Sequence, residues 1–276
     1  MSEEQIQITR TNSNTNSAKV ENKSIYPTEN IELPSKGYFY EDGNPLQNGF
    51  VEIKMMTARE EDILTNQNLI KNGTVLDKLL ESLIVGPPNV KYRDLLISDK
   101  NALYIAARRL AYGDSYGPLE IKCPSCDETN NITFDLSNIE NKEYDFSNTQ
   151  KGSNLFETTL PFSKRTIQFK ILNSFEEELI EKDLKVLSKK LKNLKTGQIT
   201  SRLKKIIVSI DGDTDKGKIN EFVDNELVSR DSMALRKLVK DKTPDIDLTS
   251  NFECESCGHE ERLDVPMTVQ FFWPES

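Results

Sequence analysis

The sequence predicts an α+β fold of two related units that share one four-cysteine site. In each half, a short segment of alternating apolar residues is followed by longer segments with helical periodicity. Each half also ends in a Cys-x-x-Cys pair within strand-like sequence, Cys123/Cys126 in the first and Cys254/Cys257 in the second. A polar segment rich in Ser, Thr, Asn and Glu precedes the first unit. We expect residues 1–30 to form a disordered tail.

Composition narrows the classes of function. The 276 residues are 36% hydrophobic and 29% charged, with a net charge of −9 and an isoelectric point near 5.0. This balance disfavours broad electrostatic binding to DNA or to an anionic membrane, because both need a basic face. The sequence has no apolar run of about 18 residues to span a bilayer and no signal-peptide pattern at its start. We therefore expect a reducing cytosol, where paired cysteines serve as metal ligands rather than disulfides.

The first unit is expected over residues 31–146. Residues 51–54 alternate like a strand, and Thr57 with Glu60 has the spacing of a capping box at a helix start. Helical periodicity predicts helices at about 58–70, 74–85 and 99–111. Strands are expected on either side of the first cysteine pair, at 119–122 and 132–136.

The second unit is expected over residues 155–276 and repeats this order. A strand at 166–170 precedes a second capping box, formed by Ser174 and Glu177. The expected helices lie at about 175–194, 199–209, 217–228 and 231–240. The second cysteine pair then enters a strand that runs through 263–265.

Fixed offsets between the halves support an internal repeat. Lys54 and Lys170 end matching strands 116 positions apart, and the motif that starts at Asp99 recurs 132 positions later at Asp231. The cysteine pairs are 131 positions apart. The growth from 116 to 132 predicts a longer helical insert in the second unit.

The four cysteines are the candidate metal ligands. Structural zinc takes four tetrahedral ligands, and thiolates form a closed set around it. The chain's complete set of cysteines is Cys123, Cys126, Cys254 and Cys257. We therefore predict that they bind one structural Zn2+ in a zinc-ribbon-like arrangement. Two units packed about a pseudo-twofold axis would bring the distant pairs together. The alternatives are two independent reduced pairs or a dithiol redox motif, although neither pair opens a helix.

The sequence disfavours common hydrolytic chemistry. His259 is the chain's one histidine, so any Ser-His-Asp or Cys-His site would depend on it. It follows a glycine in a polar stretch, and we expect an exposed loop position rather than a zinc ligand. Asp211–Gly217 begins like a calcium loop, but Lys216 and Phe222 stand where an EF-hand needs Gly and Glu. An interhelical turn is expected there.

Two further segments are candidate partner surfaces. Residues 182–205 carry nine basic side chains with leucines at helical spacing. The leucines are expected in the core, with an acidic partner for the lysines as the alternative. Three bulky residues follow one another near the C-terminus, Phe271, Phe272 and Trp273. They either pack on the zinc domain or form an exposed aromatic anchor, and we name them as candidate partner-binding residues.

The sequence contains an ordered set of seven short motifs. They are Leu33-Pro-Ser-Lys-Gly37, Met56-Thr-Ala-Arg-Glu-Glu-Asp-Ile-Leu64, Asp99-Lys-Asn-Ala-Leu103, Cys123-Pro-Ser-Cys126, Asp231-Ser-Met-Ala-Leu235, Cys254-Glu-Ser-Cys257 and Phe271-Phe-Trp-Pro274. As a set they resemble the baseplate-hub proteins of T-even-type contractile-tailed phages, over nearly all of residues 31–276. The four cysteines match the paired knuckles of that family. Asp127 departs from the usual pattern, because zinc knuckles often carry Gly there, as Gly258 does in the second knuckle.

The resemblance implies a role in building the hub of the tail baseplate, without enzymatic activity. The partners would be other phage baseplate or tail proteins, with no membrane and no nucleic acid expected. The place of action would be the host bacterial cytoplasm during assembly or the virion tail baseplate. Whether the chain is a permanent hub component or an assembly chaperone stays open. The alternative hypothesis is a zinc-ribbon nucleic-acid-binding protein, which the acidic charge balance opposes.

Overall fold

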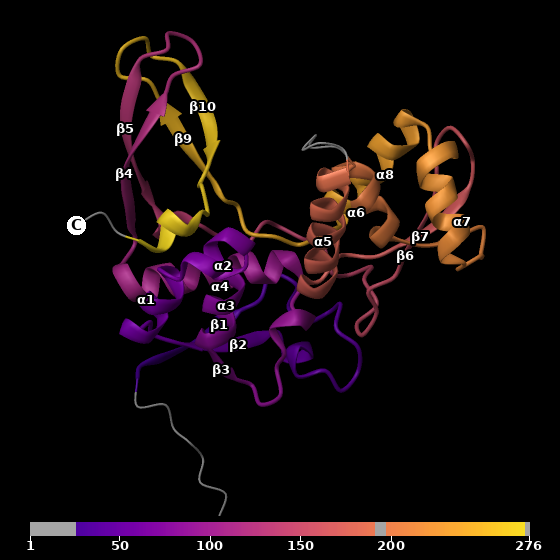
Figure 1. The fold of residues 1–276 in the computed structure, drawn as a ribbon, viewed down its shortest axis with the longest axis horizontal. Helices are drawn as coiled ribbons and strands as arrows, with labels where there is room; N and C mark the ends of the chain where they lie inside the picture. The colour runs from indigo at the N-terminus through magenta and orange to yellow at the C-terminus, as the bar shows by residue number, and fades with distance from the viewer. Residues whose placement is uncertain (1–25, 191–196, 274–276) are drawn as a thin grey trace, which may run out of the picture.

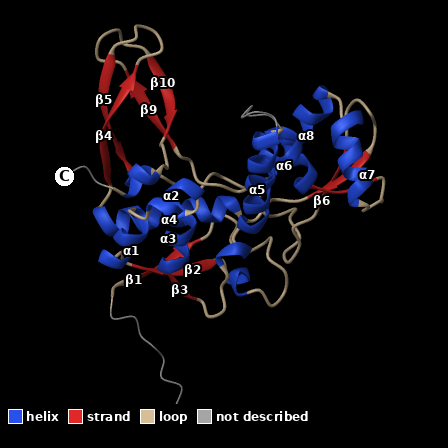
Figure 2. Cartoon of the chain, viewed as in Figure 1, coloured by secondary structure: helices blue, strands red, loops and turns tan. Residues whose placement is uncertain are grey.

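A computed structural model describes residues 26–190 and 197–273. Its elements form two helical bodies, each with a three-stranded sheet, and a pair of long β-hairpins (Figure 1). Both hairpins stand over the first body, whereas the second body lies to one side. Helices and strands are mixed throughout (Figure 2), as predicted for an α+β fold. None of the described helices is long and apolar enough to cross a membrane.

The first body packs four helices on an antiparallel sheet of order β1-β2-β3. Val51 and Ile53 are fully buried because alternate residues of β2 point to the helices. The strands are β1 Thr28–Glu32, β2 Phe50–Lys54 and β3 Ile84–Gly86. The helices are α1 Ala58–Leu64, α2 Gln67–Asn72, α3 Val75–Leu83 and α4 Ile97–Tyr112, with short 3-10 turns η1 Pro45–Asn48, η2 Tyr92–Asp94 and η3 Leu136–Asn138.

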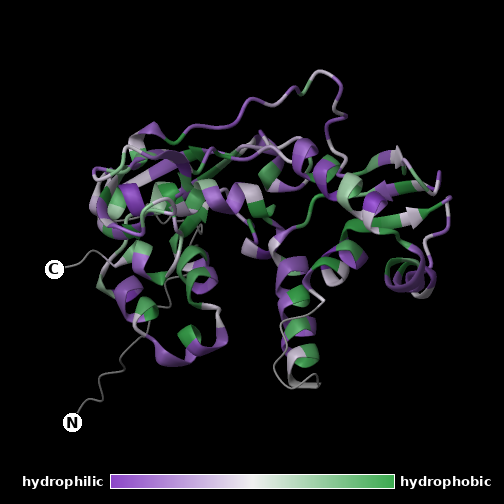
Figure 3. Ribbon diagram, turned by 90° about the horizontal axis from the view of Figure 1, so that it is seen from above, coloured by the Kyte–Doolittle hydropathy of each residue, from purple (hydrophilic) through white to green (hydrophobic). Residues whose placement is uncertain are grey.

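The second body repeats this arrangement with its own core. Its antiparallel sheet has the order β6-β7-β8 and buries Ile167, Phe169 and Ile207. The strands are β6 Phe156–Thr159, β7 Thr166–Phe169 and β8 Ile207–Ile210. The helices are α5 Ser174–Lys190, α6 Gln198–Ile206, α7 Lys216–Glu221 and α8 Ser229–Lys242, with the π-helical turn η4 Phe222–Glu226. Figure 3 shows hydrophobic and hydrophilic residues on the same helices, as expected of amphipathic elements.

The hairpins extend from different parts of the chain but lie side by side. The first consists of β4 Ser115–Lys122 and β5 Thr129–Asp135, and the second of β9 Thr249–Glu253 and β10 Glu260–Asp264. After α8 the chain returns to the first body, where two backbone hydrogen bonds hold the returning segment. The N–H of Lys142 donates to the carbonyl of Asp245 (2.7 Å), and the N–H of Asp247 donates to the carbonyl of Glu140 (2.8 Å).

Corresponding side-chain contacts occur in both bodies. Lys54 pairs with Glu60 (2.7 Å) in the first, and Lys170 pairs with Glu176 at the corresponding positions of the second. The N–H of Ser35 donates to Asp99 (2.9 Å), and the N–H of Ser163 donates to Asp231 (2.9 Å). Both of these aspartates are fully buried near the start of a helix. The offset of 132 that relates them therefore has a three-dimensional counterpart.

The predicted second unit, 155–276, is not one compact body. Its last segments pack on the first core, which includes Ile246, Val265 and both phenylalanines of the 3-10 turn η5 Val269–Phe272. The predicted unit 155–276 therefore does not match a single body of the structure. After α8 the chain returns to the first body and buries its apolar residues against α4 and β4. Of the tail predicted at 1–30, residues 1–25 lie outside the described residues. Residues 28–30 belong to β1, where Asn30 pairs with Glu52. Polar residues can form this strand because it lies at the edge of the sheet, where an apolar face is not needed.

Three element predictions also change. The helix expected at 58–70 is two helices, because Asn66 accepts from the N–H groups of Asn68 (3.0 Å) and Leu69 (3.2 Å) and starts a new one. The helix expected at 199–209 ends at Ile206, and its β-branched continuation forms β8. The helix expected at 217–228 is the short α7 followed by the π-helical turn η4.

Candidate metal centre

Each cysteine pair lies in a tight turn at the tip of a hairpin. In the first turn, Asp127 donates its N–H to the carbonyl of Cys123 (2.9 Å). In the second, Gly258 donates to the carbonyl of Cys254 at the same distance. Both turns need a left-handed residue, and the φ angles are 58° at Asp127 and 69° at Gly258. The aspartate that departs from the usual glycine therefore adopts the same conformation, which Asp tolerates better than most residues.

The two turns bring all four sulfur atoms together. The Sγ atoms of Cys123 and Cys257 are 3.7 Å apart, as are those of Cys126 and Cys254. All four sulfurs lie within 4.8 Å of one another. Each close pair joins one turn to the other, so the cluster bridges positions more than a hundred residues apart. Cys123 and Cys254 are buried, whereas Cys126 and Cys257 are exposed.

The spacing of the sulfurs is compatible with a tetrahedral metal. A disulfide needs about 2.05 Å between sulfurs, and these pairs are far longer. Four thiolates at about 2.3 Å from one zinc ion would lie about 3.8 Å from each other. The observed 3.7 Å matches that edge. The donor set, four thiols without a carboxylate or imidazole, suits a soft or borderline ion such as zinc.

Asn130 joins the two turns through its side-chain amide. It is buried on β5, and its Oδ1 accepts from the N–H of Glu255 in the second turn (3.0 Å). Its Nδ2 donates to the carbonyl of Glu128 (3.0 Å) and lies 3.5 Å from Cys254 Sγ. Sequence reasoning missed this residue, because an asparagine in a polar strand carries no signal of its distant partner.

The local hydrogen bonds favour ionisation of one thiol. Burial raises the pKa of Cys254, but the N–H groups of Cys257 and Ser256 and the Asn130 amide outweigh it and lower that pKa to about 6. At Cys126 the N–H of Glu128 lowers the pKa, and hydrogen bonds with the other thiols and burial raise it to about 12. The metal-free thiols therefore share protons unequally. A divalent cation would displace those protons, since metal ligands bind as thiolates.

The structure keeps the other candidate ligands apart from the cysteines. Within the described ranges, the close donor group consists of the four cysteines alone, and the imidazole of His259 lies 3.5 Å from the carboxylate of Glu261. In the calcium-like segment, Asp211 accepts from Arg165, and Asp213 pairs with Lys218. These carboxylates are occupied by protein cations, as in an ordinary turn.

The C-terminal aromatic residues divide into two kinds. Phe271 and Phe272 are fully buried in the first core, where Phe271 contacts Tyr116 (4.8 Å between ring centroids) and Phe272 contacts Tyr104 (5.9 Å). Their prediction as partner-binding residues is therefore wrong for this fold. The returning chain places η5 beside α4, whose apolar face would otherwise be open. Trp273 is 47% exposed and stays a candidate.

The basic stretch 182–205 is only partly described, because residues 191–196 lie outside the described residues. Leu184 packs against the second core, as expected of the leucines. Lys182 and Lys185 pair with Glu178 and Glu181 one helical turn earlier. Such pairs are typical of a solvated helix face.

These features define an α+β protein in which four thiols cluster where the tips of two hairpins meet, although the hairpins are far apart in the sequence. The chain belongs to the T4 bacteriophage base plate protein family, whose family model matches residues 27–273. No curated protein and no solved structure matches the chain. Membership of this family indicates a structural role in the phage tail baseplate, with other tail proteins as partners. A baseplate family of this kind suggests a protein that is not an enzyme.

Proposed function

We propose that this chain is a non-enzymatic assembly or structural protein of the baseplate hub, held in shape by one structural zinc ion. The family match over residues 27–273 supports the baseplate role. The observation that carries the zinc proposal is the convergence of four sulfurs within 4.8 Å of one another, with two pairs at 3.7 Å, close to the edge of a zinc–thiolate tetrahedron. Four thiolates leave zinc no open position for water or substrate, so the ion would stabilise the fold rather than catalyse a reaction.

Zinc would act by fixing the two hairpins to each other. The apolar cluster at the hairpin tips is small: Cys123, Phe252 and Cys254 are its buried members. A cluster of this size adds little apolar burial at the tips, since each buried side chain contributes only about 1.5–3 kcal/mol, and a bound ion would add to it. Cys123, Cys126, Cys254 and Cys257 would bind the ion, and Asn130 would hold the second turn in register with the first. The result is a rigid projection on the first body that partners could bind.

The zinc proposal is tested by metal content and stability. Purified protein is expected to contain one zinc per chain by mass spectrometry of the metal, and chelation is expected to lower its melting temperature. Cys254→Ser is expected to lose zinc and several kcal/mol of stability, or to fail to fold, because metal binding contributes to folding. Ser256→Ala, an exposed change in the same turn, is the control. Full stability of a zinc-free Cys254→Ser protein would contradict the proposal.

The hub proposal is tested on assembling particles. The protein is expected in hub subassemblies isolated from infected cells, and its absence is expected to stop hub formation. Quantitative mass spectrometry of mature particles beside assembly intermediates separates the two roles. Presence in both identifies a permanent hub component, and presence in intermediates alone identifies an assembly factor. Normal hub formation without the protein would overturn the proposal.

A further inference from the structure

The two helical bodies meet through a short backbone bridge. Ile97 donates its N–H to the carbonyl of Leu172 (3.2 Å), and Ser174 donates its N–H to the carbonyl of Leu95 (2.8 Å). These bonds form an antiparallel bridge centred on Leu96 and Asn173. Leu95 is buried in the core of the first body and Leu172 in the core of the second. The first body thus contributes the segment before α4, and the second body contributes the segment before α5.

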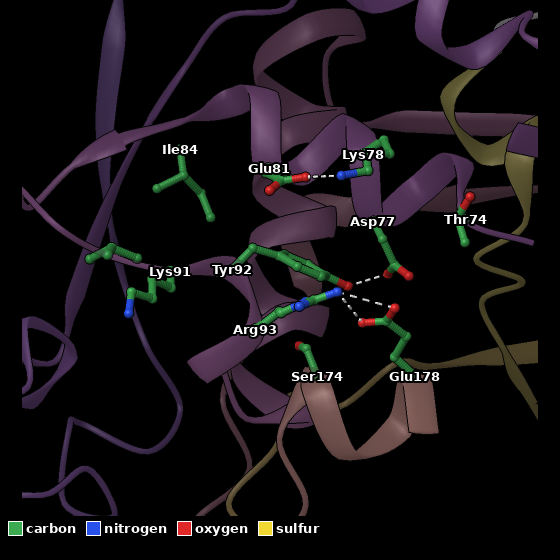
Figure 4. A pocket seen from close by; sticks show the side chains of 11 residues that line it. Thr74, Asp77, Lys78, Glu81, Ile84, Lys91, Tyr92, Arg93, Ser174 and Glu178 are labelled. Carbon is green, nitrogen blue, oxygen red and sulfur yellow. Dashed lines mark hydrogen bonds and ion pairs between the residues drawn. The ribbon is translucent and has the colours of Figure 1, made fainter. Parts of the chain in front are cut away.

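Side chains reinforce this junction around a pocket of about 430 Å3 (Figure 4). Arg93 of η2 lies 3.0 Å from the carboxylate of Glu178 of α5 and stacks over the ring of Phe175 (5.5 Å). The two bodies use different surfaces here, so the contact is head to tail. A head-to-tail contact between repeated units leaves one unused surface at each end.

The unused surface of the second body corresponds to Leu95–Ile97 of the first. The offset of 132 places it at Leu227–Ser229, directly before α8. Val228 has φ −67° and ψ 151°, nearly the values of Leu96 (φ −61°, ψ 150°). Unlike Leu96, Val228 is 38% exposed. Among the described residues, the N–H of Ser229 and the carbonyl of Leu227 have no hydrogen-bond partner.

The unused surface of the first body corresponds to Leu172–Ser174 of the second. The offset of 116 places it at Met56–Ala58, directly before α1. Thr57 is extended, with φ −124° and ψ 174°. Within the described part of the chain, the carbonyl of Met56 and the N–H of Ala58 are without a partner. These two groups are the acceptor and donor that the second-body surface lacks.

We propose that Met56–Ala58 of one copy of this chain binds Leu227–Ser229 of a second copy, repeating the internal junction between molecules. Ser229 would donate to the carbonyl of Met56, and Ala58 would donate to the carbonyl of Leu227. Thr57 and Val228 would form the antiparallel bridge. The two surfaces lie at the starts of α1 and α8, which Figure 1 shows in different helical bodies and far apart, so they serve different molecules rather than one.

Exposed apolar side chains favour burial at this end of the second body. Phe162 is 59% exposed and Met233 63% exposed, and both lie near the start of α8. Phe162 is held there because its N–H donates to the buried Asp231 (2.8 Å). A second copy would cover these side chains, as the second core covers part of Ile97 of the first body. Repeated head-to-tail contacts close into a ring or extend into a helical array.

Proline substitutions at the first helical position test the backbone bonds. Ala58 and Ser229 are the first residues of α1 and α8, and each follows an extended residue. Proline is well tolerated there, and it removes the N–H that the contact needs. Zinc-loaded full-length protein is expected to associate with rising concentration in sedimentation velocity. Ala58→Pro and Ser229→Pro are each expected to weaken association by about tenfold or more, because a buried carbonyl loses its donor.

Mixing the two variants gives the sharpest readout. Ala58→Pro leaves the second-body surface intact, and Ser229→Pro leaves the first-body surface intact. An equimolar mixture is therefore expected to form dimers at the wild-type affinity and nothing larger. An interface that uses the same surface on both copies would show no such rescue.

The controls separate association from folding. Gln67→Pro is the control, because Gln67 is the first residue of α2 and also follows an extended residue. The offset of 116 relates Gln67 to Asp183 of the second body. Asp183 does not lie at the junction between the bodies, since its carboxylate pairs with Lys205 of the same body (3.7 Å). Association of Gln67→Pro is expected to equal that of the wild type, and all three variants are expected to keep the wild-type melting temperature. Met233→Asp provides a side-chain test and is expected to weaken association. A wild-type protein that stays monomeric at high concentration, or association unaffected by both surface prolines, overturns the proposal whatever the metal content.

Discussion

At the scale of single residues, Asn130 shows how one amide can connect two parts of the chain. Its three polar contacts lie on both sides of the cysteine cluster, at Glu128, Cys254 and Glu255. Outer groups of this kind orient metal ligands and tune their basicity. Asparagine suits the place because it both donates to sulfur and carbonyl oxygen and accepts from a backbone N–H.

Asn130→Ala is expected to weaken zinc binding by about 10–100-fold, because the second turn loses its anchor and Cys254 loses a donor. Competition with a chromophoric chelator measures the affinity. Asn131→Ala, at the exposed neighbouring position, is the matched control and is expected to bind like the wild type. Equal zinc affinity for the two variants would show that Asn130 only fills space.

Glu60 gives the first body a pH-dependent contribution to stability. Burial raises the pKa of Glu60, but hydrogen bonds from Lys54, Thr57 and Ser82 outweigh it and lower that pKa to about 2. Because the folded pKa lies below the ordinary value of 4.5, the ionised carboxylate stabilises the protein above about pH 4.5. This contribution is lost as the pH falls from 4.5 towards 2.

Glu60→Gln is expected to lower the free energy of unfolding by about 2–3 kcal/mol at pH 7, since the partly buried Lys54 loses its counter-charge and the hydrogen bonds to the buried carboxylate weaken. The difference from wild type is expected to shrink as the pH falls below 4.5. Urea unfolding of both proteins across this range measures it. Glu61→Gln, at the adjacent exposed position, is expected to change little. A difference that stays constant with pH would count against the ionised carboxylate as the cause.

At the scale of elements, local hydrogen bonds explain where several of the described helices begin. The capping box predicted from Thr57 and Glu60 is present at α1, confirming that prediction. In the second half the prediction of Ser174 with Glu177 is wrong by one residue. Glu176 donates its N–H to Asn173 Oδ1 (3.0 Å), and Asn173 donates its N–H to Glu176 Oε2 (3.2 Å). The offset of 116 from Thr57 and Glu60 already points to Asn173 and Glu176.

Asn173→Ala is expected to cost about 1 kcal/mol of stability, because the N–H of Glu176 in the first turn of α5 loses its acceptor. Thr57→Ala, the corresponding change at α1, is expected to cost a similar amount. Chemical denaturation measures both. Asn173→Asp keeps the acceptor oxygen and is expected to retain near wild-type stability. In the structure the hydroxyl of Ser174 donates to the carbonyl of Leu95 (3.0 Å) and does not cap the helix. Wild-type stability of Asn173→Ala would indicate that Ser174, and not Asn173, caps α5.

The strands show where local pattern stops being enough. Ile207–Ile210 continues the apolar sequence of α6, and helical periodicity predicts that it belongs to the helix. In the structure it forms β8 and pairs Ile210 with Ile167 of β7. A short β-branched run can serve either element, and only pairing with a neighbouring strand decides between them.

At the scale of the whole molecule, the C-terminal segment ties the end of the chain to its first body. Phe271 and Phe272 contact aromatic residues of α4 and β4, and the hydroxyl of Tyr116 donates to the carbonyl of Pro266 (3.4 Å). The second body is thus enclosed in the sequence between two parts of the first. Its own core still consists of residues that lie between Leu160 and Leu235.

Phe271→Ala is expected to cost about 3–5 kcal/mol, because a large side chain leaves a cavity in the first core. Trp273→Ala is expected to change stability by about 0.5 kcal/mol or less, since that side chain is half exposed. Thermal unfolding compares the two. If Trp273→Ala also weakens binding to hub proteins at unchanged stability, Trp273 is a contact residue. A small cost at Phe271 would contradict the burial described here.

The sequence by itself determined the α+β class, the cysteine turns, the first capping box and the repeat of contacts at fixed offsets. These features depend on neighbouring residues or on patterns that one chain displays directly. Tertiary structure alone decided that the second hairpin and Phe271 belong with the first body, that Asn130 bridges the two turns, and that the bodies meet head to tail. Those outcomes depend on contacts between distant positions, where burial of apolar surface selects among arrangements that local propensity leaves equal.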